Sequence, residues 1–109
     1  ADIAGSGTPS SVTLTENSTE VQTVTDPAQI ARYTDLLASY TYVQYPHFFK
    51  PGDEQLTANR LTVTFENGNS IGVNADGYVF VNGELRDIEG SRGQELYHKL
   101  YLLFYPNAV

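Results

Sequence analysis

The sequence predicts an α+β domain in which an antiparallel β-meander sheet is packed on one face by two helices. Apolar and polar residues alternate with period two from Leu61 to Ile88, and Asn-Gly or Asp-Gly turns separate the strands. Two other stretches, starting near Asp26 and Ser91, space their apolar residues three or four apart after a helix-capping residue. Strands in series with a helix before and after them are typical of this fold class.

The chain divides into a short linker and one domain. Residues 1–10 are rich in Gly, Ser, Thr and Pro without periodicity, which predicts a flexible N-terminal linker. Residues 11–109 are predicted to form a single α+β domain. A chain of 109 residues with 40% hydrophobic residues can bury one modest core without disulfides or a structural metal.

A hairpin and a capped helix precede the meander. Val12 and Leu14 alternate with threonines, and a polar turn leads to a second strand over residues 20–25. Asp26 is a preferred N-cap, and Pro27 suits the first helical position because its missing N–H needs no partner there. The predicted core face of this helix comprises Ile30, Tyr33, Leu36, Leu37 and Tyr40.

A strand over Thr41–Tyr45 follows, and after the meander the last helix is predicted to start with a capping box formed by Ser91 and Gln94. This helix should end near Tyr105, before Pro106. Its apolar arc comprises Leu96, Leu100, Leu103 and Phe104, while Tyr97, Tyr101 and Tyr105 lie along the edge of that arc. The predicted order of elements is β-β-α-β-β-β-β-β-α.

Charge and composition exclude several classes of protein. The formal net charge of −7 disfavours binding to nucleic acids and to anionic membrane surfaces, because both carry negative phosphates. With no cysteine, the chain has no thiolate nucleophile and no cysteine-ligated metal site. Asn74-Ala75-Asp76-Gly77 lacks the spacing of a calcium loop and is predicted to be a hairpin turn. No metal, cofactor or phosphate-binding motif is predicted.

No catalytic residues are assigned. The two histidines, His47 and His98, stand in no nucleophile motif, and solvent-facing or ring-stacked side chains are expected for both. The carboxylates lie in connections, where no apolar frame raises a pKa; they include Asp53, Glu54, Asp76, Asp87 and Glu89.

Aromatic residues concentrate between Tyr40 and Phe49, and this run supplies the candidate binding residues. The candidates for binding a ligand or partner are Tyr42, Tyr45, His47, Phe48 and Phe49. Aromatic rings beside an irregular, proline-bounded segment offer rigid contact area for a protein or a glycan. The alternative is that Phe48 and Phe49 close the open end of the sheet and that the tyrosines complete the core.

The segment LTVTFENGNSIGVNADGYVFVNG, which contains Tyr78, Phe80, Asn82 and Gly83, resembles a pattern in small domains of unknown function from Gram-positive, often gut-dwelling, bacteria. In those domains a helix precedes the segment, similar to the helix here that carries Asp26, Ile30, Leu36 and Leu37. The resemblance implies a domain tethered to the cell surface as part of a lipoprotein. It carries no catalytic residues.

We therefore expect a non-enzymatic, exported interaction or structural module of a bacterial surface lipoprotein, located at the cell surface or outside the cell. Its expected partner is a protein or a cell-envelope glycan. The alternative is an inhibitor that presents the Pro46–Pro51 loop to an enzyme cleft. A third hypothesis is a small hydrolase that uses Asp53, Glu54 or Asp76, which requires a concave pocket beside those residues. The oligomeric state stays open, because exposed strand edges can pair.

Overall fold

The computed structural model describes residues 10–45, 56–90 and 92–106. Within them the chain forms a seven-stranded antiparallel sheet with two helices in contact with it, so the predicted α+β class and the order of elements are confirmed. The strands are β1 (Val12–Glu16), β2 (Thr19–Val24), β3 (Tyr42–Gln44), β4 (Arg60–Phe65), β5 (Ser70–Asn74), β6 (Val79–Val81) and β7 (Glu84–Ile88); the helices are α1 (Pro27–Ala38) and α3 (Gly93–Phe104).

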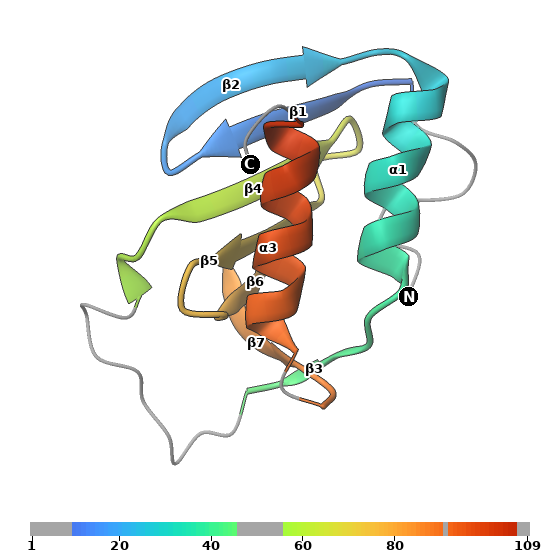
Figure 1. Cartoon of the computed structure of the whole chain (residues 1–109). Helices are drawn as coiled ribbons and strands as arrows, with labels where there is room; N and C mark the ends of the chain where they lie inside the picture. Colours follow the sequence, from blue (N-terminus) through green and yellow to red (C-terminus); the bar gives the residue numbers. More distant parts are fainter. Residues whose placement is uncertain (1–9, 46–55, 91, 107–109) are drawn as a thin grey trace.

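The strands lie in the order β2-β1-β4-β5-β6-β7-β3 (Figure 1). The meander β4 to β7 runs through neighbouring strands, as the turn signals predict. At the turn between β6 and β7, for example, Asn82 and Gly83 have φ angles of 53° and 83°, which a two-residue type I′ turn requires. The N-terminal hairpin adds to β4 through β1, and β3 closes the other edge by pairing with β7.

Both helices lie on the same face of the sheet, with α3 across its middle and α1 beside α3 (Figure 1). Cross-strand partners such as Leu14 with Val63 and Val63 with Ile71 share that face and are buried under the helices. The helices contribute to the same core, chiefly through Ile30, Tyr33, Leu37, Leu96, Leu100 and Phe104. Neither helix is long and apolar enough to cross a membrane, and this finding covers the described part of the chain.

The start of α1 agrees with its sequence signals. Asp26 is the N-cap, and its Oδ2 accepts a hydrogen bond from the backbone N–H of Gln29 at 3.2 Å. Pro27 is the first helical residue.

The N-cap of α3 is not the predicted Ser91, which lies outside the described residues. The N-cap is Arg92, one residue beyond Ser91, and it makes no side-chain capping hydrogen bond. The first helical residue, Gly93, lies against the turn between β5 and β6, where a Cβ atom at Gly93 would stand 1.8 Å from the carbonyl oxygen of Gly77. This close approach of two backbones requires glycine at the first helical position.

The other face of the sheet carries no helix in the described structure. Its threonines pair across strands, Thr13 with Thr64 and Thr15 with Thr62. On the same face the guanidinium of Arg60 lies 3.6 Å from the centre of the Phe80 ring, so that Phe80 is only 7% exposed.

The last residue of the predicted linker contacts the domain. The backbone N–H and the hydroxyl of Ser10 donate hydrogen bonds to the carboxylate of Glu66 at 2.6 and 2.7 Å.

Candidate functional site

Of the five residues that the sequence suggests for binding, Tyr42 faces the helices. It pairs with Ile88 across β3 and β7, and its ring packs against the hydrophobic core. Its hydroxyl donates a hydrogen bond to the carbonyl oxygen of Leu37 at 2.7 Å, and burial raises the pKa of Tyr42 above its ordinary value. These contacts tie the end of α1 to the sheet, so the candidate site is built around Tyr45 instead.

Tyr45 comes directly after β3 and is half-buried beside Tyr78. The two ring centres are 6.2 Å apart and the planes are inclined by 52°. Burial, with smaller effects from Tyr78 and the carboxylate of Asp87, raises the pKa of Tyr45. The phenol of Tyr45 therefore stays protonated at neutral pH, and its hydroxyl can donate a hydrogen bond.

The two rings border a pocket of about 260 Å³, which we call the Tyr45 pocket. Its wall comes from the end of β3, the turn after β5, strand β7 and the first turn of α3. The lining residues are Tyr45, Asp76, Gly77, Tyr78, Arg86, Asp87, Gly93 and Gln94. The contact between Gly77 and Gly93 brings the β5–β6 turn and the helix close enough to form one continuous wall.

The polar side chains of the Tyr45 pocket can both donate and accept hydrogen bonds. The carboxylates of Asp76 and Asp87 accept, the amide of Gln94 does both, and the guanidinium of Arg86 donates. Arg86 is also paired with Glu84 at 2.7 Å on the solvent side. The carboxylates outnumber the guanidinium in the pocket lining, so the site favours a neutral or cationic group over an anion.

The other three predicted binding residues, His47, Phe48 and Phe49, lie outside the described residues. The same holds for the Pro46–Pro51 loop of the inhibitor hypothesis and for Asp53 and Glu54. The choice between a binding surface and a plug stays a prediction for Phe48 and Phe49.

The structure places the remaining chemical candidates as follows. His98 is exposed on α3, as expected. Asn74 is fully buried, and its Oδ1 accepts hydrogen bonds from the backbone N–H groups of Asp76 and Tyr78 at 3.1 and 2.9 Å. This side chain thus holds the predicted hairpin turn. The described residues contain no group of three or more His, Asp or Glu that could hold a metal ion.

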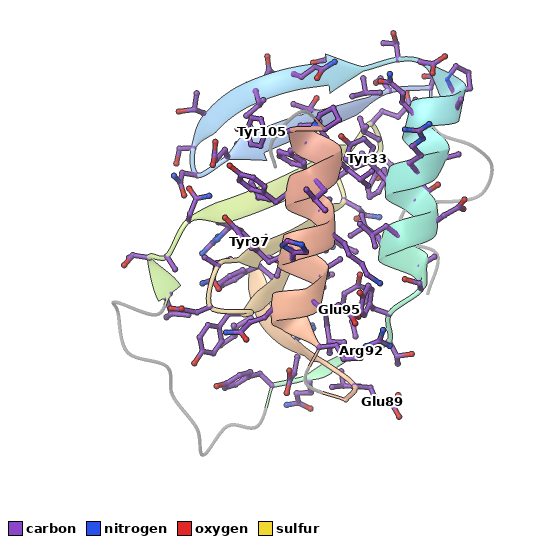
Figure 2. All side chains as sticks on the ribbon, in the orientation of Figure 1. Tyr33, Glu89, Arg92, Glu95, Tyr97 and Tyr105 are labelled. Atoms are coloured by element: carbon purple, nitrogen blue, oxygen red, sulfur yellow. The ribbon has the colours of Figure 1, made fainter. Side chains whose placement is uncertain are left out.

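A second polar cluster joins α3 to the sheet. The sequence predicts the row of tyrosines that α3 contributes to this cluster, but not their partners on other segments. The rings of Tyr97, Tyr101 and Tyr105 follow one another along α3 with centres 6.1 and 5.0 Å apart, as the spacing predicts. Figure 2 shows Tyr97 and Tyr105 on the side of α3 that faces away from α1. The partners come from distant segments: Glu16 accepts from Tyr105, and Asn59 donates to both Glu16 and Tyr97. These bonds hold the helix on the sheet.

Sequence reasoning missed Arg86, Gln94 and Tyr78 as neighbours of Tyr45. A signal existed for Tyr78, because an aromatic residue directly after the Asp76-Gly77 turn stands at one end of the sheet. Arg86 comes beside Tyr45 through the pairing of β3 with β7, and Gln94 through the contact of α3 with the β5–β6 turn; local sequence patterns show neither contact.

Comparison with known proteins gives no relative: no protein-family model matches the chain, and neither the curated proteins nor the solved structures provide a match.

Proposed function

We propose that this domain is a non-enzymatic interaction module that binds a neutral saccharide of the bacterial cell envelope in the Tyr45 pocket. The observation that carries the proposal is the pairing of the Tyr45 and Tyr78 rings above a pocket lined by hydrogen-bonding side chains. Aromatic faces pack against the C–H groups of a sugar ring, and the surrounding polar groups bind its hydroxyls.

The size of the pocket supports a small ligand group. Its volume of about 260 Å³ lies just below the roughly 300–1,000 Å³ of pockets that take drug-sized molecules. One sugar ring suits this space better than the flat surface of a folded protein. Asp76 and Asp87 disfavour an acidic sugar, because two carboxylates repel a further negative charge.

The location of the domain rests on the resemblance to bacterial surface lipoproteins and on the linker-like composition of residues 1–10. A module attached to the cell surface by a flexible segment would meet glycans of its own envelope or of its surroundings. A partner protein is the alternative ligand.

One observation favours hydrolysis as a second candidate function. Asp76 lines a concave pocket together with Asp87, which is the geometry that the hydrolase hypothesis requires. Asp76 is exposed to solvent, however, and a general acid needs surroundings that keep its carboxyl protonated. We therefore propose binding without turnover.

The experiment compares Tyr45→Leu with Tyr45→Phe. A panel of neutral oligosaccharides and purified cell-wall polysaccharide is titrated into each labelled protein, and amide shifts are followed by NMR. We expect binding by the wild type and by Tyr45→Phe, since the ring persists, and a loss of about tenfold or more for Tyr45→Leu. Lys99→Gln, on the exposed face of α3, is the control that retains wild-type binding.

Two results contradict the proposal. Saccharide binding that Tyr45→Leu leaves unchanged places the ligand elsewhere. Release of new reducing ends from the oligosaccharides by the wild type, abolished by Asp76→Asn, establishes the hydrolase instead. Unfolding curves of each variant separate a loss of binding from a loss of fold.

A further inference from the structure

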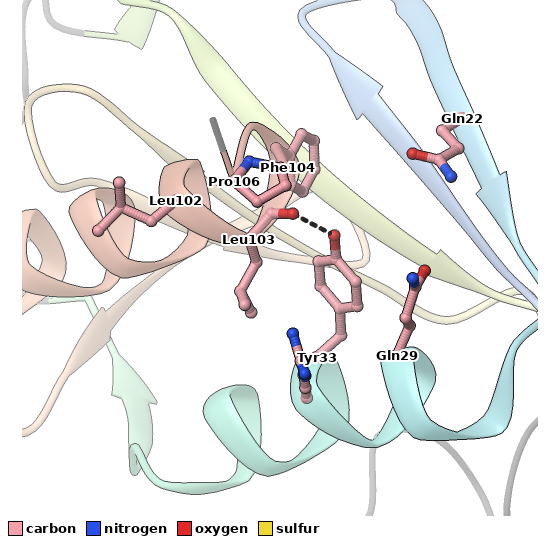
Figure 3. Close-up of a pocket in the computed structure, with 8 residues that line it drawn as sticks. Gln22, Gln29, Tyr33, Leu102, Leu103, Phe104 and Pro106 are labelled. Atoms are coloured by element: carbon pink, nitrogen blue, oxygen red, sulfur yellow. Dashed lines mark hydrogen bonds between the residues drawn. The ribbon is translucent and has the colours of Figure 1, made fainter. Parts of the chain in front are cut away.

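A groove of about 270 Å³ lies at the opposite end of the helical layer from the Tyr45 pocket, between α1, the last turn of α3 and strand β2 (Figure 3). Its apolar wall comprises Tyr33, Leu102, Leu103 and Pro106. The hydroxyl of Tyr33 donates to the carbonyl oxygen of Leu103 at 2.9 Å, which fixes the two helices at this point. An apolar wall fixed in this way is a preformed surface for a ligand.

Among the described residues that line the groove, Arg32 is the charged one, and it lies on the polar side with the amides of Gln22 and Gln29. Among the described cations, Arg86, Arg92 and Lys99 have a glutamate within 4.0 Å, and Arg60 lies on the Phe80 ring. Arg32 alone among them has neither kind of partner. In an acidic domain, a guanidinium that no described carboxylate pairs with is an available site for one from outside.

Strand β2 borders the groove and ends the sheet on this side. Every residue from Thr19 to Thr23 is exposed, and alternate backbone N–H and C=O groups along an edge strand point away from the sheet. The register between β1 and β2 shifts between Leu14 and Thr15, opposite the first half of β2. Gln22, which lines the groove, belongs to the regularly paired half of β2, from Gln22 to Val24.

We propose that this groove binds the C-terminal end of an extended peptide. The peptide adds as a strand to the Gln22–Val24 half of β2, inserts an apolar side chain between Leu103 and Tyr33, and places its terminal carboxylate against Arg32. A strand edge and an apolar groove side by side are the arrangement that proteins use for peptide strand addition. An edge strand that no further described strand pairs with can bind a peptide backbone, which distinguishes this occupant from a small organic acid.

A second copy of the chain is a less suitable occupant. Each copy carries a formal charge of −7, so pairing two edges brings like charges together. The site also differs in chemistry from the Tyr45 pocket, whose carboxylates disfavour an anion. The proposal therefore stands independently of saccharide binding.

The experiment uses two acetylated hexapeptides of alternating Thr and Val that end in Leu, one with a free C-terminal carboxylate and one with an amide. Each is titrated into the labelled protein, and the amide signals of β2, α1 and the end of α3 are followed by NMR. We expect the free acid to shift the signals of Gln22 to Val24 and of the first two turns of α1. The amide peptide and the Arg32→Gln variant should each bind about tenfold more weakly or worse.

Arg32 is exposed on α1, so its substitution by Gln leaves the fold intact, and Lys99→Gln serves as the matched control that retains binding. Equal affinity for the acid and amide peptides, or no shift at millimolar peptide, overturns the proposal. Shifts of β2 signals that depend only on protein concentration identify a second copy as the occupant, which also overturns it. Octanoate is the further probe: shifts with octanoate but not with the acid peptide assign the groove to small organic acids instead.

Discussion

The hydroxyl of Tyr105 donates a hydrogen bond to Oε1 of Glu16 at 2.5 Å, joining the C-terminal end of α3 to the end of β1. The other carboxylate oxygen accepts from Asn59 at 2.8 Å, so three segments far apart in the sequence meet at one side chain. A carboxylate held by two neutral donors ties the helical layer to the N-terminal hairpin.

Removal of the Tyr105 hydroxyl tests this bond. Tyr105→Phe should lower the free energy of unfolding by about 1–2 kcal/mol, because a charge-assisted hydrogen bond is lost while the ring contacts stay. Tyr101→Phe is the matched control, since no described side chain bonds to its hydroxyl, and it should change stability by about 0.5 kcal/mol or less. Urea unfolding curves measure both. Equal effects of the two substitutions would show that the Glu16 bond adds nothing.

At low pH the carboxylate of Glu16 should no longer contribute to the free energy of unfolding. Hydrogen bonds from Tyr105 and Asn59 lower the pKa of Glu16 in the folded state below its ordinary value of 4.5. A lowered pKa means that this stabilisation is present above the unfolded-state pKa and disappears as the pH falls through the folded-state pKa. The stability difference between wild type and Glu16→Gln should therefore shrink as the pH falls below the ordinary value of 4.5. A difference that stays constant over this range contradicts the assignment.

At high pH the hydrogen bond between Tyr105 and Glu16 should be lost because the Tyr105 hydroxyl ionises. The hydrogen bond to Glu16, with burial, raises the pKa of Tyr105 from 10.0 to about 12. A raised pKa gives stabilisation that is full below the unfolded-state value and is lost as the pH rises from 10.0 through about 12. Absorbance titration at the phenolate band should show a tyrosine that ionises late, and in Tyr105→Phe this late component should be reduced.

The contact of Gly93 with Gly77 predicts an effect opposite to helix propensity. Alanine is about 1 kcal/mol more favourable than glycine within an exposed helix. Here the added Cβ would meet the Gly77 carbonyl oxygen at 1.8 Å, so Gly93→Ala should destabilise the domain by about 3 kcal/mol or more. Gly68→Ala is the control: its φ of 91° is strained for alanine, but no atom lies within 4 Å, and a cost of about 1 kcal/mol is expected. Thermal or urea unfolding that ranks Gly68→Ala as the worse variant would contradict the contact.

The N-cap of α1 predicts a smaller effect. Asp26→Ala removes the acceptor for the Gln29 N–H and should cost about 1 kcal/mol of stability. Asp35→Ala, an exposed aspartate on the same helix, makes the same chemical change without a cap and should stay within about 0.5 kcal/mol. Circular dichroism during urea unfolding distinguishes the two.

The features that the sequence predicts correctly are local ones. The turn at Asn82 and Gly83 needs positive φ angles, and the residues that tolerate them stand in the sequence for that reason. Asp26 caps α1 because an N-cap and its acceptor N–H lie within one helical turn. The tyrosine row follows from the helical period alone.

Contacts between distant segments were not predictable in this way. Nothing in Leu14 or its neighbours indicates that β1 lies beside β4, and nothing in Tyr42 indicates that β3 pairs with β7. The first residue of α3 must be glycine because of the Gly77 carbonyl, a contact that local capping rules do not include. Tyr45 was suggested by its chemistry, whereas Arg86 and Gln94 join it only through the fold.

The strand order also has a consequence for the kinetics of folding. Strands β4 to β7 pair with their neighbours in sequence, so each step closes only a short loop and its entropic cost is small. The pairing of β1 with β4, and of β3 with β7, must instead close long loops. The segment between β1 and β4 includes helix α1. We expect the meander to be largely formed in the folding transition state and both sheet edges to join afterwards. Substitutions at β1 should then mainly accelerate unfolding, while those at β5 should slow folding.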